Sequence, residues 1–103
     1  MASGRLATAQ LTPGVGTVVY TCPAGRVATV NFSILNQSLS DGVVDVAVIA
    51  GASPVSGEYI EKNSLLLNGE GFERTAIVLT AGQKLHMTVS FDSSEVNIWG
   101  FEE

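Results

Sequence analysis

Apolar and polar side chains alternate in short runs along the chain, and glycine or proline residues separate the runs. Residues 26–35 and 84–91 alternate most regularly, and Phe32 and Met87 are among the positions that we expect to face inward. Such alternation places every second side chain on one face of a β-strand. No segment keeps apolar residues at helical spacing for three turns, so we expect no long helix. The pattern predicts an all-β protein.

The number and length of the runs indicate one small sandwich. We expect strands at 5–11, 17–22, 26–35, 43–50, 59–63, 72–80, 84–91 and 95–101, with 65–67 as a further short strand or an edge turn. Seven or eight strands in 103 residues are typical of a single antiparallel β-sandwich, here jelly-roll-like. We expect residues 1–12 to form an N-terminal arm or edge strand and residues 13–103 to form the sandwich domain.

Composition agrees with this class and adds a hint of assembly. Thirteen valines, five isoleucines and eight threonines favour strands. Only 15% of the residues are charged and 46% are hydrophobic, whereas about 25% are charged in a typical soluble domain. A small domain has much surface for its volume, so we expect other subunits to cover part of it. The formal net charge of −5 argues against nucleic acid and against a basic membrane-docking face.

The lone cysteine and the absence of long apolar runs bear on location. Cys22 has no intrachain partner, which fits folding in a reducing cytoplasm. The first residues contain no apolar stretch of signal-peptide length, and no run approaches the length of a membrane span. We therefore expect a soluble protein.

The residues offer little for catalysis. His86 is the only histidine, and the alternation places it on the outward side of its strand. Cys22 precedes Pro23 at a strand end, with no helix N-terminus to activate its thiol as a nucleophile. We interpret them as a surface histidine and an inert thiol, and we expect no enzyme activity.

Metal, carboxylate and phosphate sites are equally poorly supported. One histidine and one cysteine cannot supply the four ligands of a structural zinc site. The turn containing Asp92 and Glu95 could touch Ca²⁺ but lacks the ligand count of an EF-hand loop. The acidic pairs Glu58 with Glu61 and Glu70 with Glu73 lie in turn-rich stretches where exposed acids are common. No phosphate-binding glycine loop is present, and we expect no metal and no cofactor.

The aromatic residues near the C-terminus are more informative. Val96 and Ile98 share one strand face, while Asn97, Trp99 and Phe101 share the other. If the first face is buried, Trp99 and Phe101 point outward, as anchors of a subunit interface or as a sugar-binding platform. In the opposite register Trp99 plugs the end of the core. The polar loop 36–42 also contains Leu39, which we expect to pack.

Several segments together resemble one class of phage protein. They are Tyr20–Asn31 (YTCPAGRVATVN), Val46–Ile49 (VAVI), Gly57–Glu61 (GEYIE), Glu73–Leu85 (ERTAIVLTAGQKL) and Trp99–Glu102 (WGFE). The chain from Val18 to Glu103 resembles the small β-sandwich virion proteins of tailed double-stranded DNA bacteriophages, which include decoration (cement), head and tail structural proteins. The motifs are strand and turn patterns, and Cys22 and Leu35 stand where the pattern favours a smaller or more polar residue.

The resemblance implies a virion structural protein, synthesised in the host cytoplasm, with no catalytic residues. We expect a capsid decoration protein that assembles as a homotrimer and binds the major capsid protein or other virion proteins. Candidate interface residues are Trp99, Phe101, Phe72, Leu6 and Leu11. The last two belong to the segment Met1–Thr12, which could add a strand to a neighbour. Alternatives are a tail, collar, baseplate or fibre module, and a lectin-like domain using Trp99, Asn97 and Asp92.

Overall fold

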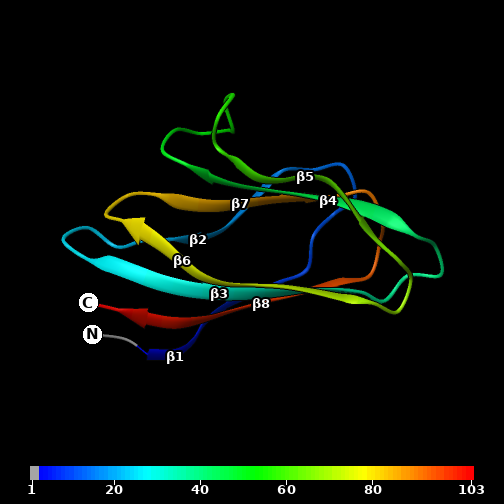
Figure 1. The fold of residues 1–103 in the computed structure, drawn as a ribbon, viewed down its shortest axis with the longest axis horizontal. Coiled ribbons are helices and arrows are strands. Elements are labelled where there is room, and N and C mark those ends of the chain that lie inside the picture. The colour runs from blue at the N-terminus through cyan, green and yellow to red at the C-terminus, as the bar shows by residue number, and fades with distance from the viewer. Residues whose placement is uncertain (1–2) are drawn as a thin grey trace.

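The computed structural model describes residues 3–103 as eight β-strands in two four-stranded sheets (Figure 1). The strands are β1 (Ser3–Ala9), β2 (Thr17–Thr21), β3 (Val27–Asn36), β4 (Gly42–Ile49), β5 (Tyr59–Leu66), β6 (Gly71–Thr80), β7 (Lys84–Val89) and β8 (Ser94–Glu102). Neighbouring strands in each sheet are antiparallel. The predicted all-β sandwich is confirmed. Residues 3–103 include no helix that is long and apolar enough to cross a membrane.

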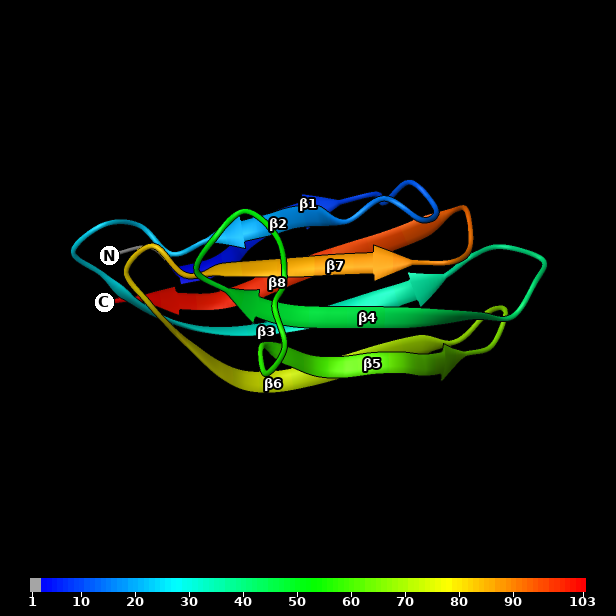
Figure 2. The ribbon, with the colours of Figure 1, turned by 90° about the horizontal axis from the view of Figure 1, so that it is seen from above.

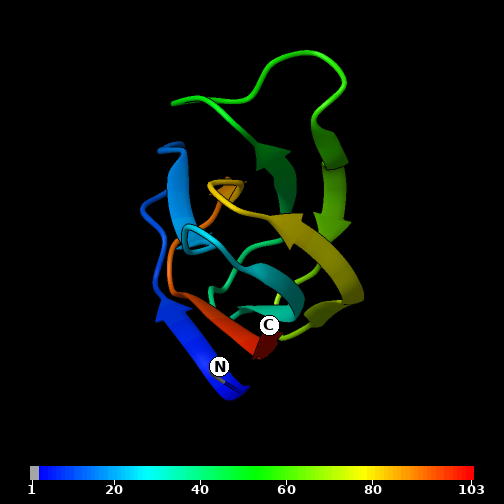
Figure 3. The same ribbon diagram turned by 90° about the vertical axis from the view of Figure 1, so that its left-hand side faces the viewer.

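The order of the strands is that of a jelly roll. One sheet has the order β1-β8-β3-β6 and the other β2-β7-β4-β5. Among residues 3–103, only the β4–β5 connection stays within one sheet, and the other connections cross between the two layers. The end-on view in Figure 3 shows the two layers with the β4–β5 loop beyond them. Because each strand pairs mainly with strands distant in sequence, this order could not be read from the runs alone.

The core lies between the two sheets and follows the alternation. Phe32 and Ile34 of β3 belong to the same core as Leu85 and Met87 of β7, and all four side chains are fully buried. Val96 and Ile98 of β8 belong to the same core. Since alternate residues point to opposite faces, the other residues of β8 must point away from the core.

All four edge strands are irregular, whereas the central pairs are not. The register shifts between Arg5 and Ala7 for β1, between Val18 and Tyr20 for β2, between Val30 and Phe32 opposite β6, and twice along β4 opposite β5. The pairs β3–β8 and β4–β7 show no shift. Bulges of this kind twist an edge strand and hinder its pairing with another chain.

Two predicted segments, 59–63 and 65–67, form part of one strand, β5. Asn63 interrupts the alternation because its φ is +52°, a conformation that side chains other than glycine adopt with some strain. The Asp45 carboxylate of β4 accepts the Asn63 backbone N–H at 2.7 Å and so stabilises this bulge. A bulge interrupts the alternation of inward and outward side chains, which explains why the sequence suggested two separate strands at 59–63 and 65–67.

The loops divide between the two ends of the long axis. The β1–β2, β3–β4, β5–β6 and β7–β8 loops lie together at one end, on the right in Figure 2. The β2–β3 and β6–β7 turns lie at the other end, near the C-terminus (Figure 2). The β4–β5 loop arches over the outward face of β4 and β7 (Figures 1 and 2). The sheet β1-β8-β3-β6 has no such cover among the described residues.

Candidate interaction surface

The uncovered outward face of the sheet β1-β8-β3-β6 carries the two C-terminal aromatic residues. Val96 and Ile98 are buried in the core, and Trp99 and Phe101 therefore point outward. Trp99 is half-buried and Phe101 is 41% exposed. The structure thus excludes the alternative in which Trp99 plugs the core.

Neighbouring strands extend this aromatic pair into a patch. Trp99 lies between Asn31 of β3 and Arg5 of β1, and Phe101 lies beside Thr29 of β3. Thr29 in turn lies beside the exposed Val78 of β6. We call Thr29, Asn31, Val78, Trp99 and Phe101 the aromatic patch. None of the five is charged.

Acidic residues of the same face lie away from the aromatic patch. Glu73 pairs with Ser33, and Glu95 pairs with Leu35, both near the opposite end of β3. Glu95 also accepts a hydrogen bond from the Gln10 side chain at 2.9 Å. The patch therefore combines apolar area with no acidic residue of its own, and the exposed Arg5 beside Trp99 is a charged residue at its rim.

The Asn31 side chain fixes the middle of the aromatic patch. Its Nδ2 donates to the Trp99 carbonyl at 3.3 Å, and its Oδ1 accepts the Ala76 N–H at 3.0 Å. Ala76 has φ +60° in the bulge of β6. Sequence reasoning missed Asn31 and Val78, because alternation gives the face of a residue but not which strands lie side by side.

Gly100 determines how closely β8 approaches β3. Its φ is +147°, and a Cβ atom there would lie 2.1 Å from the Thr29 carbonyl oxygen. Any larger residue would have to push β8 away from β3 at this point. Because Gly100 lies between Trp99 and Phe101, it sets the position of both aromatic side chains.

A hydrogen bond between the sheets holds the strand end that carries the patch. The Tyr20 hydroxyl of β2 donates to the Glu102 carboxylate of β8. Burial of the ring, followed by the hydrogen bond and the negative charge of Glu102, raises the pKa of Tyr20 well above its ordinary value. The phenol therefore stays protonated and remains a donor at neutral pH.

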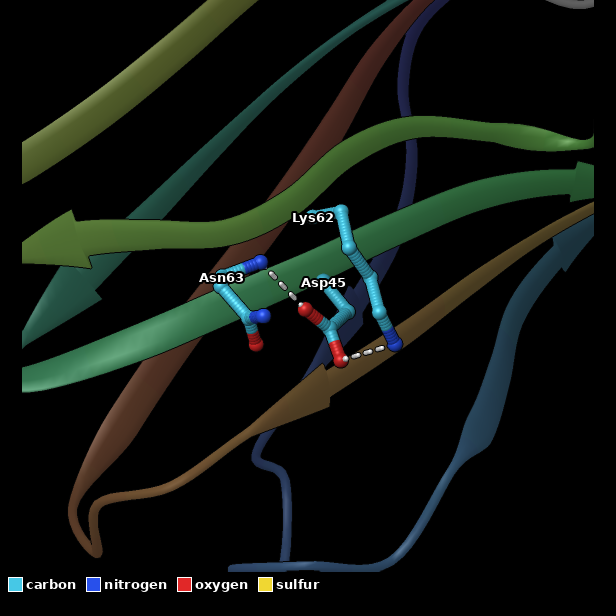
Figure 4. Close-up of polar contacts among 3 residues, drawn as sticks. All are labelled: Asp45, Lys62 and Asn63. Carbon is cyan, nitrogen blue, oxygen red and sulfur yellow. Dashed lines mark hydrogen bonds and ion pairs between the residues drawn. The ribbon is translucent and has the colours of Figure 1, made fainter.

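The outward face of the other sheet has a different character. The Asp45 carboxylate contacts the Lys62 ammonium at 3.4 Å as well as the Asn63 N–H (Figure 4). The Lys62 nitrogen also lies 4.3 Å from the centroid of the Tyr59 ring. These charges and the aromatic ring are already engaged with one another.

The β4–β5 loop covers much of the rest of that face. Ala47 and Ile49 point away from the core yet are fully buried. Lys84 donates to the Ala50 and Gly51 carbonyls, at 3.1 and 3.0 Å, and so ties the loop to β7. This face is therefore a weaker candidate for a contact surface than the aromatic patch.

The other predicted interface residues pack inward. Leu11 is 5% exposed and belongs to the core, so it presents no contact surface on this chain. Leu6, at the bulge of β1, and Phe72 of β6 are half-buried and pack against the core. The Phe72 ring lies 6.0 Å from the Phe32 ring. Only Trp99 and Phe101 of the five share an exposed face.

His86 is buried, which corrects its expected place on the surface. It does lie on the outward side of β7, but it is 9% exposed because Gly16 of the β1–β2 loop packs on its ring. Burial lowers the pKa of its imidazole. The Cys22 thiol belongs to the core on the other side of the same sheet. The structure does not bring this thiol and this imidazole together.

The carboxylates of Glu58 and Glu61 bind neighbouring groups of the chain itself. Glu58 accepts the N–H groups of Ala50 and Val55 and so holds the β4–β5 loop. Glu61 pairs with Arg74 across the edge of the sandwich. Within residues 3–103, no group of three or more His, Cys, Asp or Glu side chains is placed to hold a metal ion.

The proposed sugar-binding set is not assembled. Asn97 and Trp99 share the outward face of β8, whereas Asp92 lies in the β7–β8 turn before that strand. At roughly 3.3 Å per residue, Asp92 lies too far from Trp99 to bind the same sugar ring.

Comparisons with known proteins add no relative. No protein-family model, no curated protein and no solved structure matches the chain.

Proposed function

We propose that the chain is a non-enzymatic structural protein of a tailed-phage virion. Its role is that of a capsid decoration (cement) protein, which assembles as a homotrimer and stabilises the head by binding neighbouring capsid subunits. The observation that carries the proposal is the aromatic patch on an uncovered sheet face of a jelly-roll sandwich. The resemblance of the strand and turn motifs to small virion proteins supports the same class.

The surface area of the chain is compatible with such an assembly. A standard interface buries about 800 Å² per partner, and a subunit in a ring of three makes two such contacts. About 1,600 Å² of the 5306 Å² of exposed surface would then be covered. Coverage on this scale accounts for a small domain in which only 15% of the residues are charged.

The mechanism of stabilisation is mechanical and involves no reaction. The two layers are joined through the core, by the Tyr20–Glu102 hydrogen bond and by the Glu61–Arg74 ion pair at the edge. A force on one sheet is therefore passed to the other through many contacts. A rigid sandwich of this kind can hold capsid subunits against the outward pressure of packaged DNA.

Contacts between faces are favoured over the addition of strands. Residues 3–9 are paired with β8 in their own sheet, so most of the segment Met1–Thr12 is not a free arm in this chain. Met1 and Ala2 lie outside the described residues. All four edge strands carry register shifts, which oppose pairing with another sheet.

The first experiment measures the mass in solution by light scattering coupled to size exclusion over a dilution series. We expect a trimer of about 32 kDa, three times 10.7 kDa. Trp99→Ala should shift the mass toward the monomer, because it removes the largest side chain of the aromatic patch. Tyr59→Ala, which removes an exposed aromatic ring from the other outward face, should leave the mass unchanged. A monomer at every concentration would contradict self-association.

Two other assignments lead to different results. A tail, collar, baseplate or fibre module would also self-associate, and antibody labelling of virions would place it on the tail. A lectin-like domain would bind on a glycan array and lose binding in Trp99→Ala without a change of mass. The separation of Asp92 from Trp99 makes this the weaker alternative.

A further inference from the structure

The four loops at the end away from the C-terminus form a surface of uniform charge. These loops, residues 10–16, 37–41, 67–70 and 90–93, contain Asp41, Glu70 and Asp92 but no lysine, arginine or histidine. The two ion pairs found among residues 3–103 involve Lys62 and Arg74, which lie within strands. No ion pair neutralises the three loop carboxylates there.

The tip of the β3–β4 loop presents an apolar side chain from a rigid support. Leu39 is 98% exposed, which corrects the expectation that it packs. The loop beneath it is built around Asn36, whose Oδ1 accepts the Ser38 N–H at 2.9 Å and whose Nδ2 donates to the Ser40 carbonyl at 3.0 Å. The Gln37 N–H donates to the Ser93 carbonyl at 3.0 Å. Binding through Leu39 would therefore cost little loop entropy.

Two further exposed leucines lie on the adjoining segment. Leu65 is 66% exposed and Leu67 is also exposed. The β5–β6 loop that follows them is hydrogen-bonded to the β3–β4 loop, from the Asn68 N–H to Asp41 at 2.9 Å and from the Gly69 N–H to the Asn36 carbonyl at 2.8 Å. We call Leu39, Leu65 and Leu67, with the carboxylates around them, the leucine end.

We infer that the leucine end is a docking surface for a second protein, whose apolar socket is bordered by lysine or arginine side chains. Charge complementarity selects this occupant. A second copy docked end to end would bring the carboxylates of both copies together, and an anionic membrane would repel them. A scattered exposed leucine needs no explanation, but here three lie on two segments that are hydrogen-bonded to each other and whose loops carry only negative charge.

The same end also has a hollow with a polar lining. An open, polar hollow of about 470 Å³ is lined by Gln10, Leu11, Thr12, Gln37, Ser93 and Ser94. A neighbouring depression includes Glu95. Gln37 of the β3–β4 loop lines this hollow, so the hollow adjoins the loop that carries Leu39.

The leucine end is a second contact surface, separate from the aromatic patch, and it stands even if the chain proves monomeric. The test is selection of a displayed library of random 12-residue peptides on the folded chain, followed by Kd measurements on the selected peptides. We expect peptides that combine apolar residues with lysine or arginine. Leu39→Ser should weaken their binding about tenfold or more, and Val55→Ser, at an exposed apolar residue of the β4–β5 loop, should not.

A charge variant tests the second half of the inference. Asp41→Asn removes one carboxylate but keeps an oxygen that can accept the Asn68 N–H, so the loop should be preserved. We expect it to weaken binding several-fold and to reduce the loss of affinity between 50 and 500 mM NaCl. A circular dichroism melt of each variant checks that the fold is intact.

Four results would overturn the inference. The first is a library that yields no peptide whose binding depends on Leu39, and the second is a set of selected peptides without an excess of lysine or arginine. The third is a concentration-dependent rise in the mass of the chain that Leu39→Ser abolishes. The fourth is sedimentation of the chain with phosphatidylcholine vesicles that Leu39→Ser abolishes. The third would make a second copy the occupant and the fourth a lipid surface. Because Trp99→Ala tests the proposed trimer separately, failure of one proposal is distinguishable from failure of the other.

Discussion

Asn36 is the buried polar residue on which the β3–β4 loop depends, and replacing it should be costly. Its side chain is fully buried and makes four hydrogen bonds. Nδ2 donates to the carbonyls of Ser40 and Leu66, at 3.0 and 3.1 Å. Oδ1 accepts from the N–H and the hydroxyl of Ser38, at 2.9 and 2.7 Å. Asn36→Ala removes all four together.

The magnitude follows from the groups left behind. A buried polar group that loses its partner costs about 1–3 kcal/mol. The Leu66 carbonyl lies on a buried residue and keeps most of that cost, whereas the Ser38 and Ser40 groups can reach water. We therefore expect Asn36→Ala to lower the free energy of unfolding by about 2–4 kcal/mol.

Urea denaturation followed by far-UV circular dichroism measures this loss. With an m-value of about 1 kcal/mol per molar urea, the midpoint should fall by about 2–4 M. Asn97→Ala is the matched control, because Asn97 points outward from β8 and its loss should cost less than about 0.5 kcal/mol. If Asn36→Ala costs no more than Asn97→Ala, the reasoning about buried hydrogen bonds at this site is refuted.

Asn36→Asp gives an independent check through pH. The new carboxyl group keeps the size of the amide but turns an oxygen toward the Ser40 and Leu66 carbonyls. Only its protonated form can donate to either of them, so its pKa in the folded state is raised. Stability is then greatest near pH 4 and falls as pH rises through the raised pKa. A flat profile above pH 4 would contradict the assigned donor and acceptor roles.

Three further predictions concern other contacts. Gly100→Ala should lower the free energy of unfolding by about 2 kcal/mol or more, because the added Cβ would clash with the Thr29 carbonyl of β3. A thermal melt measures this loss. The control Gly51→Ala, at a glycine with open space around it, should be nearly neutral. The pKa of Tyr20 is raised in the folded state, so the free energy of unfolding should fall above about pH 10, where the phenol of the unfolded chain ionises. Tyr20→Phe should remove that fall. An unchanged alkaline slope in this variant would refute the assignment. The pKa of His86 is lowered in the folded state, so the neutral imidazole contributes to the free energy of unfolding above about pH 6.5, and this contribution is lost as pH falls below that value. On acidification, the urea midpoint of His86→Gln should therefore fall less than that of the unsubstituted chain.

The alternation of side chains predicted the fold class and the inward residues, but not the order of strands. The pattern of residues 26–35 and 84–91 placed Phe32 and Met87 correctly in the core. It also gave the outward direction of Trp99 once Val96 was known to be buried. Which strands lie side by side depends on long-range packing, and so the aromatic patch, drawn from three strands, needed the structure.

The failures have local physical causes. The strand β5 was divided in two because Asn63 forms a bulge that interrupts the period of two. His86 was placed correctly on the outward side of β7 but is covered by a loop distant in sequence, at Gly16. Leu39 was expected to pack because it is apolar, yet polar contacts beneath it hold it in solvent. In the last two cases the side-chain type was known, but the sequence did not show whether another segment covers it.

The irregular edges of both sheets have a consequence for how this protein can change over time. If the chain is a decoration protein made in many copies, as proposed, smooth sheet edges would let crowded copies join into fibres. With every edge bulged, association is left to side chains on faces and loop tips. Single substitutions at those positions can alter the choice of partner, while the backbone that prevents uncontrolled growth stays the same.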